Sequence, residues 1–412
     1  MKLISLLGLF GIVAMAWLCS LNRKKFPWRT VFCGIGLQFI FGALILNTKG
    51  GEAFFDFFQR AVGKIIGFAD EGSKMVFGPL ANGPLLTEKW GPENSFIFVI
   101  TVSATIILVS AISSFLYHYG ILQKIVRSVA WVMRRAMRTS GSESLAAAAN
   151  IFMGQTEAAL VVKAYLPGMT RSEIMALMTA GMATIASGVL AAYVSFGVSA
   201  GHLLTASVMS APAGLLIAKV MLPETEPSET EGGANAVVER ESINGLDALC
   251  RGASDGLTMA LNVMAMLIAF VAVVALANFL LSYSLRAVGI QAATPFQTVF
   301  GYINAPFAWL MGVPRKDCLV IGQILGERIV LNEFIGYLSL AKVQSALEPR
   351  SFILATYALC GFANFSSIAI QIGGIGSLAP NRRGDLARLG FRAMIGGLLA
   401  SYLTATVAGI LI

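Results

Sequence analysis

Two carboxylates stand inside stretches that otherwise resemble apolar helix. Glu157 lies in NIFMGQTEAALVVKAYL at 150–166, and Glu333 lies in LNEFIGYL at 331–338. A carboxylate at the centre of a bilayer costs roughly 2.5–3.5 kcal/mol on insertion scales, so it needs a partner or a task there. The chemistry open to these groups is to accept hydrogen bonds from hydroxyl groups or to balance a cation.

Other hydrogen-bonding side chains surround both carboxylates, the second set lying in GFANFSSIAI at 361–370. They offer more hydrogen-bonding capacity than two carboxylates need, which is typical of a site for a polar, neutral solute with several hydroxyl groups. The alternative is structural, with each carboxylate neutralising a lysine such as Lys163 or capping a helix. The neighbours are Asn150, Gln155, Thr156, Asn364, Ser366 and Ser367.

The same segments could also hold a bare monovalent cation. Gly154 and Pro167 frame the first stretch, and a re-entrant hairpin there would leave carbonyl groups at its tip unpaired. Free carbonyls with one or two side-chain oxygens suit a cation such as sodium, and Asn150 and Thr184 have oxygens of the right type. Alternatively, Thr184 bonds back to its own helix.

The composition identifies a membrane protein. Of 412 residues, 56% are hydrophobic and 13% are charged, and the mean hydropathy is +0.75. A soluble chain carries about twice that charge. Seven runs approach or exceed the roughly 20 apolar residues that cross a bilayer; they are 3–20, 30–47, 95–116, 174–198, 203–222, 257–283 and 393–412.

The positive charge of +8 does not indicate a nucleic-acid partner, because the basic residues lie in short loops between apolar runs. The basic segments at 21–29, 121–138 and 379–392 are predicted to be cytoplasmic, which puts both termini in the periplasm if there are eight spans. Apolar residues recur at helical intervals within 49–92 and 121–138, which predicts a helix along the outer surface in the first and a helix with a basic cytoplasmic face in the second. The first twenty residues are predicted to be a retained helix, since NRKKFPWR follows them in place of a cleavage site.

The chain is predicted to contain two related halves. Glu157 is followed 26 residues later by the interrupted helix ATIASGVLAAY, and Glu333 is followed 28 residues later by GFANFSSIAI. Interrupted helices at matching positions of two repeats are the sequence mark of a secondary transporter. We expect N-terminal helices, interfacial helices and scaffold over 1–138, a first repeat over 139–222, a flexible cytoplasmic loop over 223–252, a scaffold helix over 253–293 and a second repeat over 294–412.

Four separated segments in the same order resemble the concentrative nucleoside transporter family. They are NIFMGQTEAALVVKAYL, MTAGMATIASGVLAAYVSFGV at 178–198, VLNEFIGYL at 330–338 and CGFANFSSIAI at 360–370. The likeness covers about 139–377 strongly and the first three helices only in layout. It implies an all-α polytopic membrane protein of bacterial size, with eight transmembrane helices, two re-entrant hairpins, an inverted repeat and a homotrimeric assembly.

The resemblance also assigns site residues. It implies that the nucleobase meets the hairpin tip at Gln155, Thr156 and Glu157, with Glu157 acting partly through water, and that Val189 and Phe362 line the base pocket. The ribose hydroxyls would meet Glu333, Asn364 and Ser367. Sodium would be held by the side chains of Asn150 and Thr184 and by the carbonyls of Met153 and Ile185. One departure is Ala159, where many members have proline.

The expected function is therefore sodium-coupled nucleoside import across a bacterial inner membrane by alternating access, with no cofactor beyond the coupling ion. A proton-coupled symporter is the alternative, although proton-driven relatives resemble this chain with GQSE in place of GQTE. An intramembrane enzyme is disfavoured because neither histidine lies near either motif. A passive channel is disfavoured because the polar clusters lie on interrupted helices.

Overall fold

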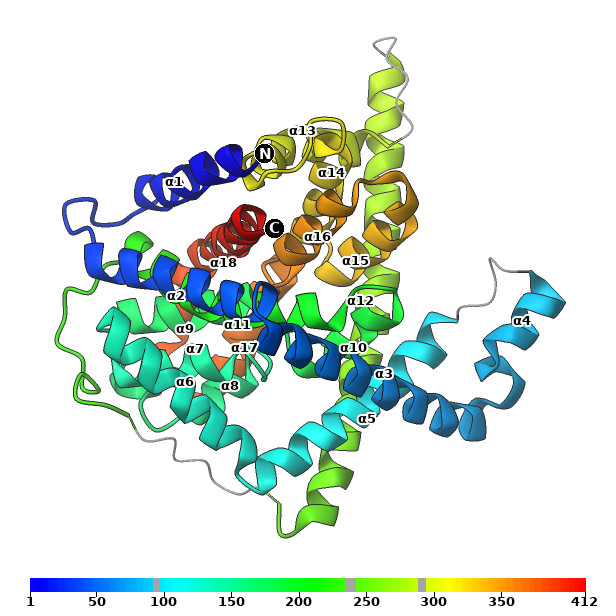
Figure 1. Cartoon of the computed structure of the whole chain (residues 1–412), viewed down its shortest axis with the longest axis horizontal. Coiled ribbons are helices and arrows are strands. Elements are labelled where there is room, and N and C mark those ends of the chain that lie inside the picture. Colours follow the sequence, from blue (N-terminus) through cyan, green and yellow to red (C-terminus); the bar gives the residue numbers. More distant parts are fainter. Residues whose placement is uncertain (92–96, 235–241, 288–293) are drawn as a thin grey trace.

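The computed structural model describes residues 1–91, 97–234, 242–287 and 294–412. Within these ranges every regular element is a helix, as Figure 1 shows. The described part holds six helical segments that are long and apolar enough to cross a membrane, and two shorter apolar helices, α1 (Lys2–Leu18) and α17 (Phe365–Leu378). An all-helical membrane fold is thereby confirmed, while the number of eight spans stays a prediction.

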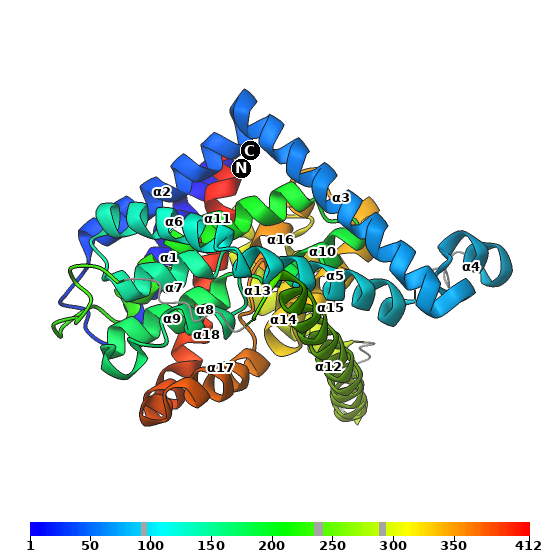
Figure 2. The same cartoon turned by 90° about the horizontal axis from the view of Figure 1, so that it is seen from below.

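The N-terminal part forms the rim of the molecule. It contains α1, α2 (Trp28–Leu46), α3 (Lys49–Phe77) and, after a short 3₁₀ turn at Gly78–Ala81, α4 (Gly83–Trp90). In Figure 2 α3 runs away from the body and carries α4 at its far end. The helical periodicity predicted within 49–92 is correct for the described residues, and Thr48 caps α3 by accepting from the Gly51 amide.

Two further helices flank the centre. In α5 (Phe98–His118) and the 43-residue α12 (Gly245–Ala287) long apolar faces pack against each other. Helix α6 (Ile121–Met137) confirms the helix predicted at 121–138, since its buried residues recur at helical spacing. Those residues are Val126, Ala130, Met133 and Met137.

The centre is built from two runs of helices in the same order. The first comprises α7 (Gly141–Ala149), α8 (Glu157–Val161), α9 (Arg171–Ala183), α10 (Ser187–Ser195) and α11 (Ala200–Met221). After α13 (Pro295–Met311), the second comprises α14 (Cys318–Val330), α15 (Glu333–Lys342), α16 (Pro349–Leu359), α17 and α18 (Arg383–Leu411). Short 3₁₀ turns at Leu166–Gly168, Gln344–Ala346 and Pro380–Arg382 connect them. Helix α18 packs on both α9 and α11, so the two runs share one core (Figure 1).

The helix interruptions have local causes. At the first, Thr184 and Ala186 adopt extended backbone angles between α9 and α10. In the second run, Asn332 and Asn364 are extended, and each side chain accepts from a backbone amide in the first turn of the next helix. An asparagine cap begins a new helix and so fixes where the previous one ends.

The basic segments gather at one end of the molecule. Arg29 donates to the carbonyls of Ala136 and Arg135, 3.3 and 3.5 Å away, and Arg392 donates to the carbonyl of Cys19 at 3.3 Å. The termini also lie together, with Lys2 Nζ 3.4 Å from the Leu411 carbonyl oxygen (Figure 1). Basic loops on one side support the predicted orientation, since such loops remain cytoplasmic.

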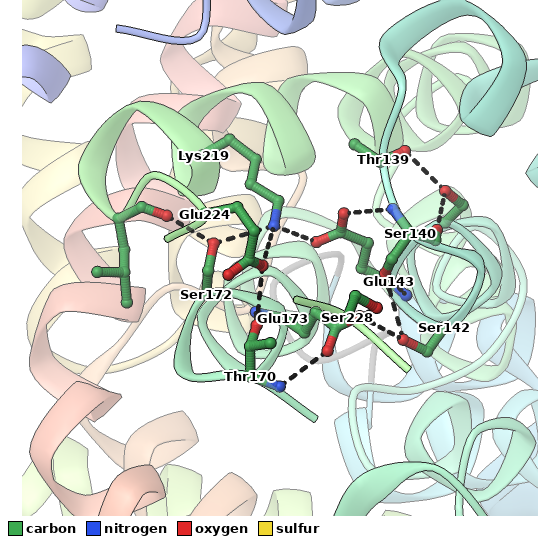
Figure 3. Close-up of polar contacts among 12 residues, drawn as sticks. Thr139, Ser140, Ser142, Glu143, Thr170, Ser172, Glu173, Lys219, Glu224 and Ser228 are labelled. Carbon is green, nitrogen blue, oxygen red and sulfur yellow. Dashed lines mark hydrogen bonds and ion pairs between the residues drawn. The ribbon is translucent and has the colours of Figure 1, made fainter. Parts of the chain in front are cut away.

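A buried polar cluster ties the bases of α7, α9 and α11 together (Figure 3). Lys219 Nζ lies 2.7 Å from Glu143 Oε2 and 3.2 Å from Glu224 Oε2, and it donates to Ser172 Oγ at 2.9 Å. Glu173 Oε1 accepts from Ser228 Oγ at 2.6 Å. The segment 223–234, part of the predicted flexible loop, contains no helix and is bound to α9 through bonds such as that from Ser228.

Two sequence-based boundaries differ from the observed elements. Helix α12 begins at Gly245, so residues 245–252 of the segment assigned to the loop are helical. Residues 235–241 of that loop, and 288–293 of the segment assigned to the scaffold helix, lie outside the described residues.

Candidate functional site

Glu333 is the first residue of α15 and is only 4% exposed. Its Oε1 accepts from the Tyr193 hydroxyl at 3.1 Å, and its Oε2 accepts from Asn364 Nδ2 at 3.1 Å. Tyr193 comes from α10 in the first run, whereas Asn364 begins α17 in the second. The carboxylate is thus held where the two runs meet, with lone pairs left for further donors.

The cap on α17 fixes the direction of the Asn364 amide. Its Oδ1 accepts from the Ser367 backbone amide at 2.9 Å and from Ser366 Oγ at 2.7 Å. Because an amide nitrogen can only donate, the oxygen must face these donors and the nitrogen must face Glu333. The helix cap therefore also orients a ligand of the carboxylate.

Arg328 is a second buried charge in this region. This side chain is fully buried in α14, and its guanidinium donates to the Ala358 carbonyl and to Ser401 Oγ. Its guanidinium carbon lies 5.9 Å from the centre of the Tyr402 ring. The site thus contains one buried carboxylate and one buried cation from the same helical pair.

Gln155 brings the tip of the first hairpin-like segment to α17. Its Nε2 lies 3.3 Å from Ser367 Oγ, and its Oε1 accepts from Gln371 Nε2 at 3.0 Å. Beside it, a Cβ placed on Gly374 would come within 2.3 Å of Thr156 Cγ2, so only glycine allows this close approach. The structure therefore brings Gln155 against Ser367 and Thr156 against Gly374, across the two runs.

The four proposed cation ligands lie in a buried turn and a helix break. Asn150 is fully buried, and its Nδ2 donates to the Ala146 carbonyl at 3.0 Å, which leaves its Oδ1 with no partner among the described residues. Thr184 Oγ1 donates to the Ala180 carbonyl at 2.9 Å, so the back-bonding alternative is confirmed. A hydroxyl that donates in this way still has lone pairs.

The two main-chain carbonyls proposed as cation ligands, those of Met153 and Ile185, also lack backbone partners among the described residues. In the part of the chain that the structure describes, no backbone amide bonds the carbonyl of Met153 or Ile185. A buried acceptor without a partner costs about 1–3 kcal/mol unless something occupies it; Ile185 is buried and Met153 is partly buried. The donor set of one amide oxygen, one hydroxyl and two carbonyls fits a monovalent cation.

Glu157 lines a cavity to which Glu333 does not contribute. Its Oε2 accepts from the Gly154 amide at 3.0 Å, and its exposed side chain lines a cavity of about 500 Å³ with Met153 and Asp255 of α12. Lys163 also lines this cavity, but among the described residues it forms no ion pair with Glu157. The two glutamates do not touch, and the connection between them runs through Gln155 and Ser367.

The apolar candidates lie close to these groups. Val189 is buried in α10, one helical turn before Tyr193, so both lie on one face of that helix. The backbone amide of Phe362 donates to the carbonyl of Thr184 at 3.3 Å, which joins the interruption of the second run to that of the first.

Sequence reasoning missed three functional neighbours: Tyr193, Arg328 and Gln371. A charge within the apolar segment CLVIGQILGERIV could have drawn attention to Arg328. Tyr193 stands one turn after Val189, and Gln371 one turn after Ser367, so helical spacing from the predicted residues would have found both.

A polar site between interrupted helices from two related runs, inside an all-helical membrane protein, defines the class of secondary transporters. Sequence comparison then gives the family. The family models described as Na+ dependent nucleoside transporter N-terminus and C-terminus match residues 7–80 and 202–409, and one described as nucleoside recognition matches 99–200. The chain belongs to the Na+-dependent nucleoside transporter family, as its four motifs predicted.

Curated relatives agree. The chain is 41% identical over 408 residues to an uncharacterized transporter, YutK, of Bacillus subtilis, covering 99% of this chain and 98% of that protein. It is also 41% identical over 426 residues to solute carrier family 28 member 3 of Mus musculus, covering all of this chain but 59% of the mouse protein. These relatives are transporters, so the expectation that the chain is not an enzyme is confirmed.

Solved structures match along the whole chain. CNTnw in an inward-facing substrate-bound state superposes with a TM-score of 0.93 at 35% identity, covering 100% of this chain and 98% of that one. A substituted CNTnw in an outward-facing state gives the same TM-score and identity, covering 97% of its own chain. The fold match is therefore close to both states.

Proposed function

We propose that the chain is a sodium-coupled nucleoside symporter that imports its substrate across a bacterial inner membrane. The observation that carries this proposal is the donor-held carboxylate of Glu333 at the meeting of the two runs, with the unpaired oxygen of Asn150 in the same core. A carboxylate accepts from vicinal hydroxyls, which suits a ribose, and an unpaired buried oxygen suits a sodium ion.

Each residue has a proposed role. Glu333, Asn364 and Ser367 take the ribose, since Asn364 and Ser367 stand at the start of the helix that also orients the carboxylate. Gln155 and Thr156 take the nucleobase from the hairpin tip, Glu157 acts from its cavity side through water, and Val189 and Phe362 supply apolar surface. Sodium is held by Asn150, Thr184 and the carbonyls of Met153 and Ile185.

The proposed coupling is physical linkage through the hairpin tip. The sodium ligands Asn150 and Met153 lie immediately before Gln155 in the chain, so filling the cation site orders the residues that contact the nucleobase. Movement of the loaded unit past α5 and α12 then exposes the site to the cytoplasm. One charge crossing 100 mV is worth about 2.3 kcal/mol, enough for roughly fifty-fold accumulation.

The scaffold helix supports a trimeric assembly. In the most apolar stretch of α12 only 6% is buried within one chain, and large side chains such as Leu261, Ile268 and Phe279 are exposed on it. Such a surface needs lipid or another protomer to cover it. We propose that α12 contacts neighbouring copies in a homotrimer and that both termini lie in the periplasm.

The test is uptake of radiolabelled uridine into proteoliposomes under three separate conditions: an inward sodium gradient, an inward proton gradient, and no gradient. Sodium alone is expected to drive accumulation, and the Glu333→Ala variant is the negative control. Stimulation by protons with no response to sodium would support the proton-coupled alternative, and chemical change of the uridine would point to an enzyme. Equal uptake under all three conditions would indicate a passive channel.

A further inference from the structure

Gln371 is a fully buried amide that contacts the tip of the first hairpin-like segment. It lies on α17, one turn after Ser367, so the two side chains lie on one helix face. Gln371 Nε2 donates to Gln155 Oε1 and to the carbonyl of Met178 on α9, both at 3.0 Å. Its own Oε1 has no partner among the described residues.

These contacts determine which way both amides point. The Met178 carbonyl can only accept, so the nitrogen of Gln371 must face it. That nitrogen also faces Gln155, so Gln155 must present its oxygen to Gln371 and direct its own nitrogen toward Ser367 Oγ, 3.3 Å away. The orientation follows from one backbone carbonyl and does not depend on how either amide was assigned.

The packing around this contact makes it rigid. A Cβ on Gly181 of α9 would come within 2.9 Å of both Gln155 Cβ and Gln371 Nε2, so the missing side chain lets the two amides lie against the helix. Gln155 is in turn held by Ser367 and Gln371, and these two bonds use only one of the two N–H groups of its amide.

We infer that Gln371 is a positioning residue that holds the Gln155 amide with its NH₂ group toward the nucleobase, so that the site favours bases presenting a carbonyl or ring-nitrogen acceptor. This inference rests on the proposed nucleoside function. It also accounts for the unpaired oxygen of Gln371. The nitrogen of that amide must bond both the Met178 carbonyl and Gln155 Oε1, so the oxygen has to point away from them.

The test is a double-mutant cycle with Gln371→Met and Gln155→Ala, read out as equilibrium binding of uridine at saturating sodium. Methionine keeps the volume and removes the unpaired oxygen, so the variant should fold; Gln371→Leu serves if it does not. Ile370→Met, on the exposed side of the same helix, is the matched control. We expect Gln371→Met to weaken uridine binding five- to tenfold, and the double variant to bind like Gln155→Ala alone.

A second readout separates positioning from general packing. The C-phenyl riboside, which keeps the ribose but has no acceptor on its ring, should compete equally well for the unsubstituted protein and for Gln371→Met. Additive effects in the cycle, unchanged uridine affinity, or an equal loss of affinity for both ligands would overturn the inference. No uridine binding by the unsubstituted protein would overturn the proposed function instead.

Discussion

The two halves of the candidate site are prepared to different degrees. Around Glu333 each carboxylate oxygen already accepts a hydrogen bond, one from Tyr193 and one from Asn364. Around Asn150 an oxygen is left unpaired, as are the carbonyls of Met153 and Ile185 within the described residues. From this difference we propose that the half assigned to the ribose is rigid before binding, whereas the half that carries the hairpin tip is completed by a cation.

The sharpest test of the rigid half is Glu333→Ala. We expect uridine binding to weaken at least a hundredfold, because the change removes the ribose acceptor and leaves Tyr193 and Asn364 without it, and charged hydrogen bonds contribute about 1.5–3 kcal/mol each. Isothermal titration at saturating sodium measures the loss, and gel filtration checks the fold. Glu348→Ala, in an exposed ion pair with Lys316, is the control. Affinity like that of the unsubstituted protein would refute the role of Glu333.

The half of the site around Asn150, which has unpaired oxygens, is tested by the sodium dependence of uptake. Asn150→Ala should raise the sodium concentration for half-maximal uptake more than tenfold, because it removes the unpaired oxygen. Thr184→Val should raise it less, about threefold, because the carbonyl ligands remain. Uptake is measured over a sodium series at saturating uridine.

The control for this pair is Thr205→Val. Thr205 Oγ1 bonds back to the Gly201 carbonyl as Thr184 does to Ala180, but it lies on α11 away from the break. If Thr184→Val and Thr205→Val shift the sodium dependence equally, Thr184 has no role in the cation site. An unchanged dependence in Asn150→Ala would remove the distinction between the two halves.

A smaller effect is expected from Tyr193→Phe. The ring stays stacked on Tyr337, with centroids 4.3 Å apart, and only the bond to Glu333 is lost. Uridine affinity should fall three- to tenfold, while a 2′,3′-dideoxynucleoside, which cannot use Glu333, should bind equally to both proteins. Tyr357→Phe, whose hydroxyl contacts His202 instead, is the control. Equal losses for both ligands would mean that Tyr193 acts only through packing.

Local sequence signals located the interruptions, because they depend on neighbouring residues. The break predicted from Ala183 falls at 184–186, and the one predicted from Gly361 falls between α16 and α17, where Asn364 caps the new helix. The predicted site residues Glu333 and Asn364 touch as a result. Both residues lie at helix starts, and helix starts are what the sequence signals locate.

Contacts across the two runs could not be read from the sequence. Tyr193 is an ordinary tyrosine near the end of an apolar helix until the fold places Glu333 against it. The lysine proposed as a structural partner, Lys163, is exposed, whereas Lys219 is the buried one. The composition of 223–234 suggested flexibility, but Ser228 finds an acceptor on Glu173 that only tertiary structure supplies.

The smallest effect on uridine affinity is expected from Lys219→Met, because Lys219 lies outside both halves of the site. Breaking one side of a buried ion pair leaves Glu143 uncompensated and should cost about 3–5 kcal/mol of stability. Adding Glu143→Gln should recover part of that loss, because the buried charge is then removed. Thermal unfolding measures both, and uridine affinity of the folded protein should stay within twofold. A larger change in affinity would mean that the cluster at the base of α7 also sets the position of the hairpin tip, and the incomplete half would then extend from Asn150 to Lys219.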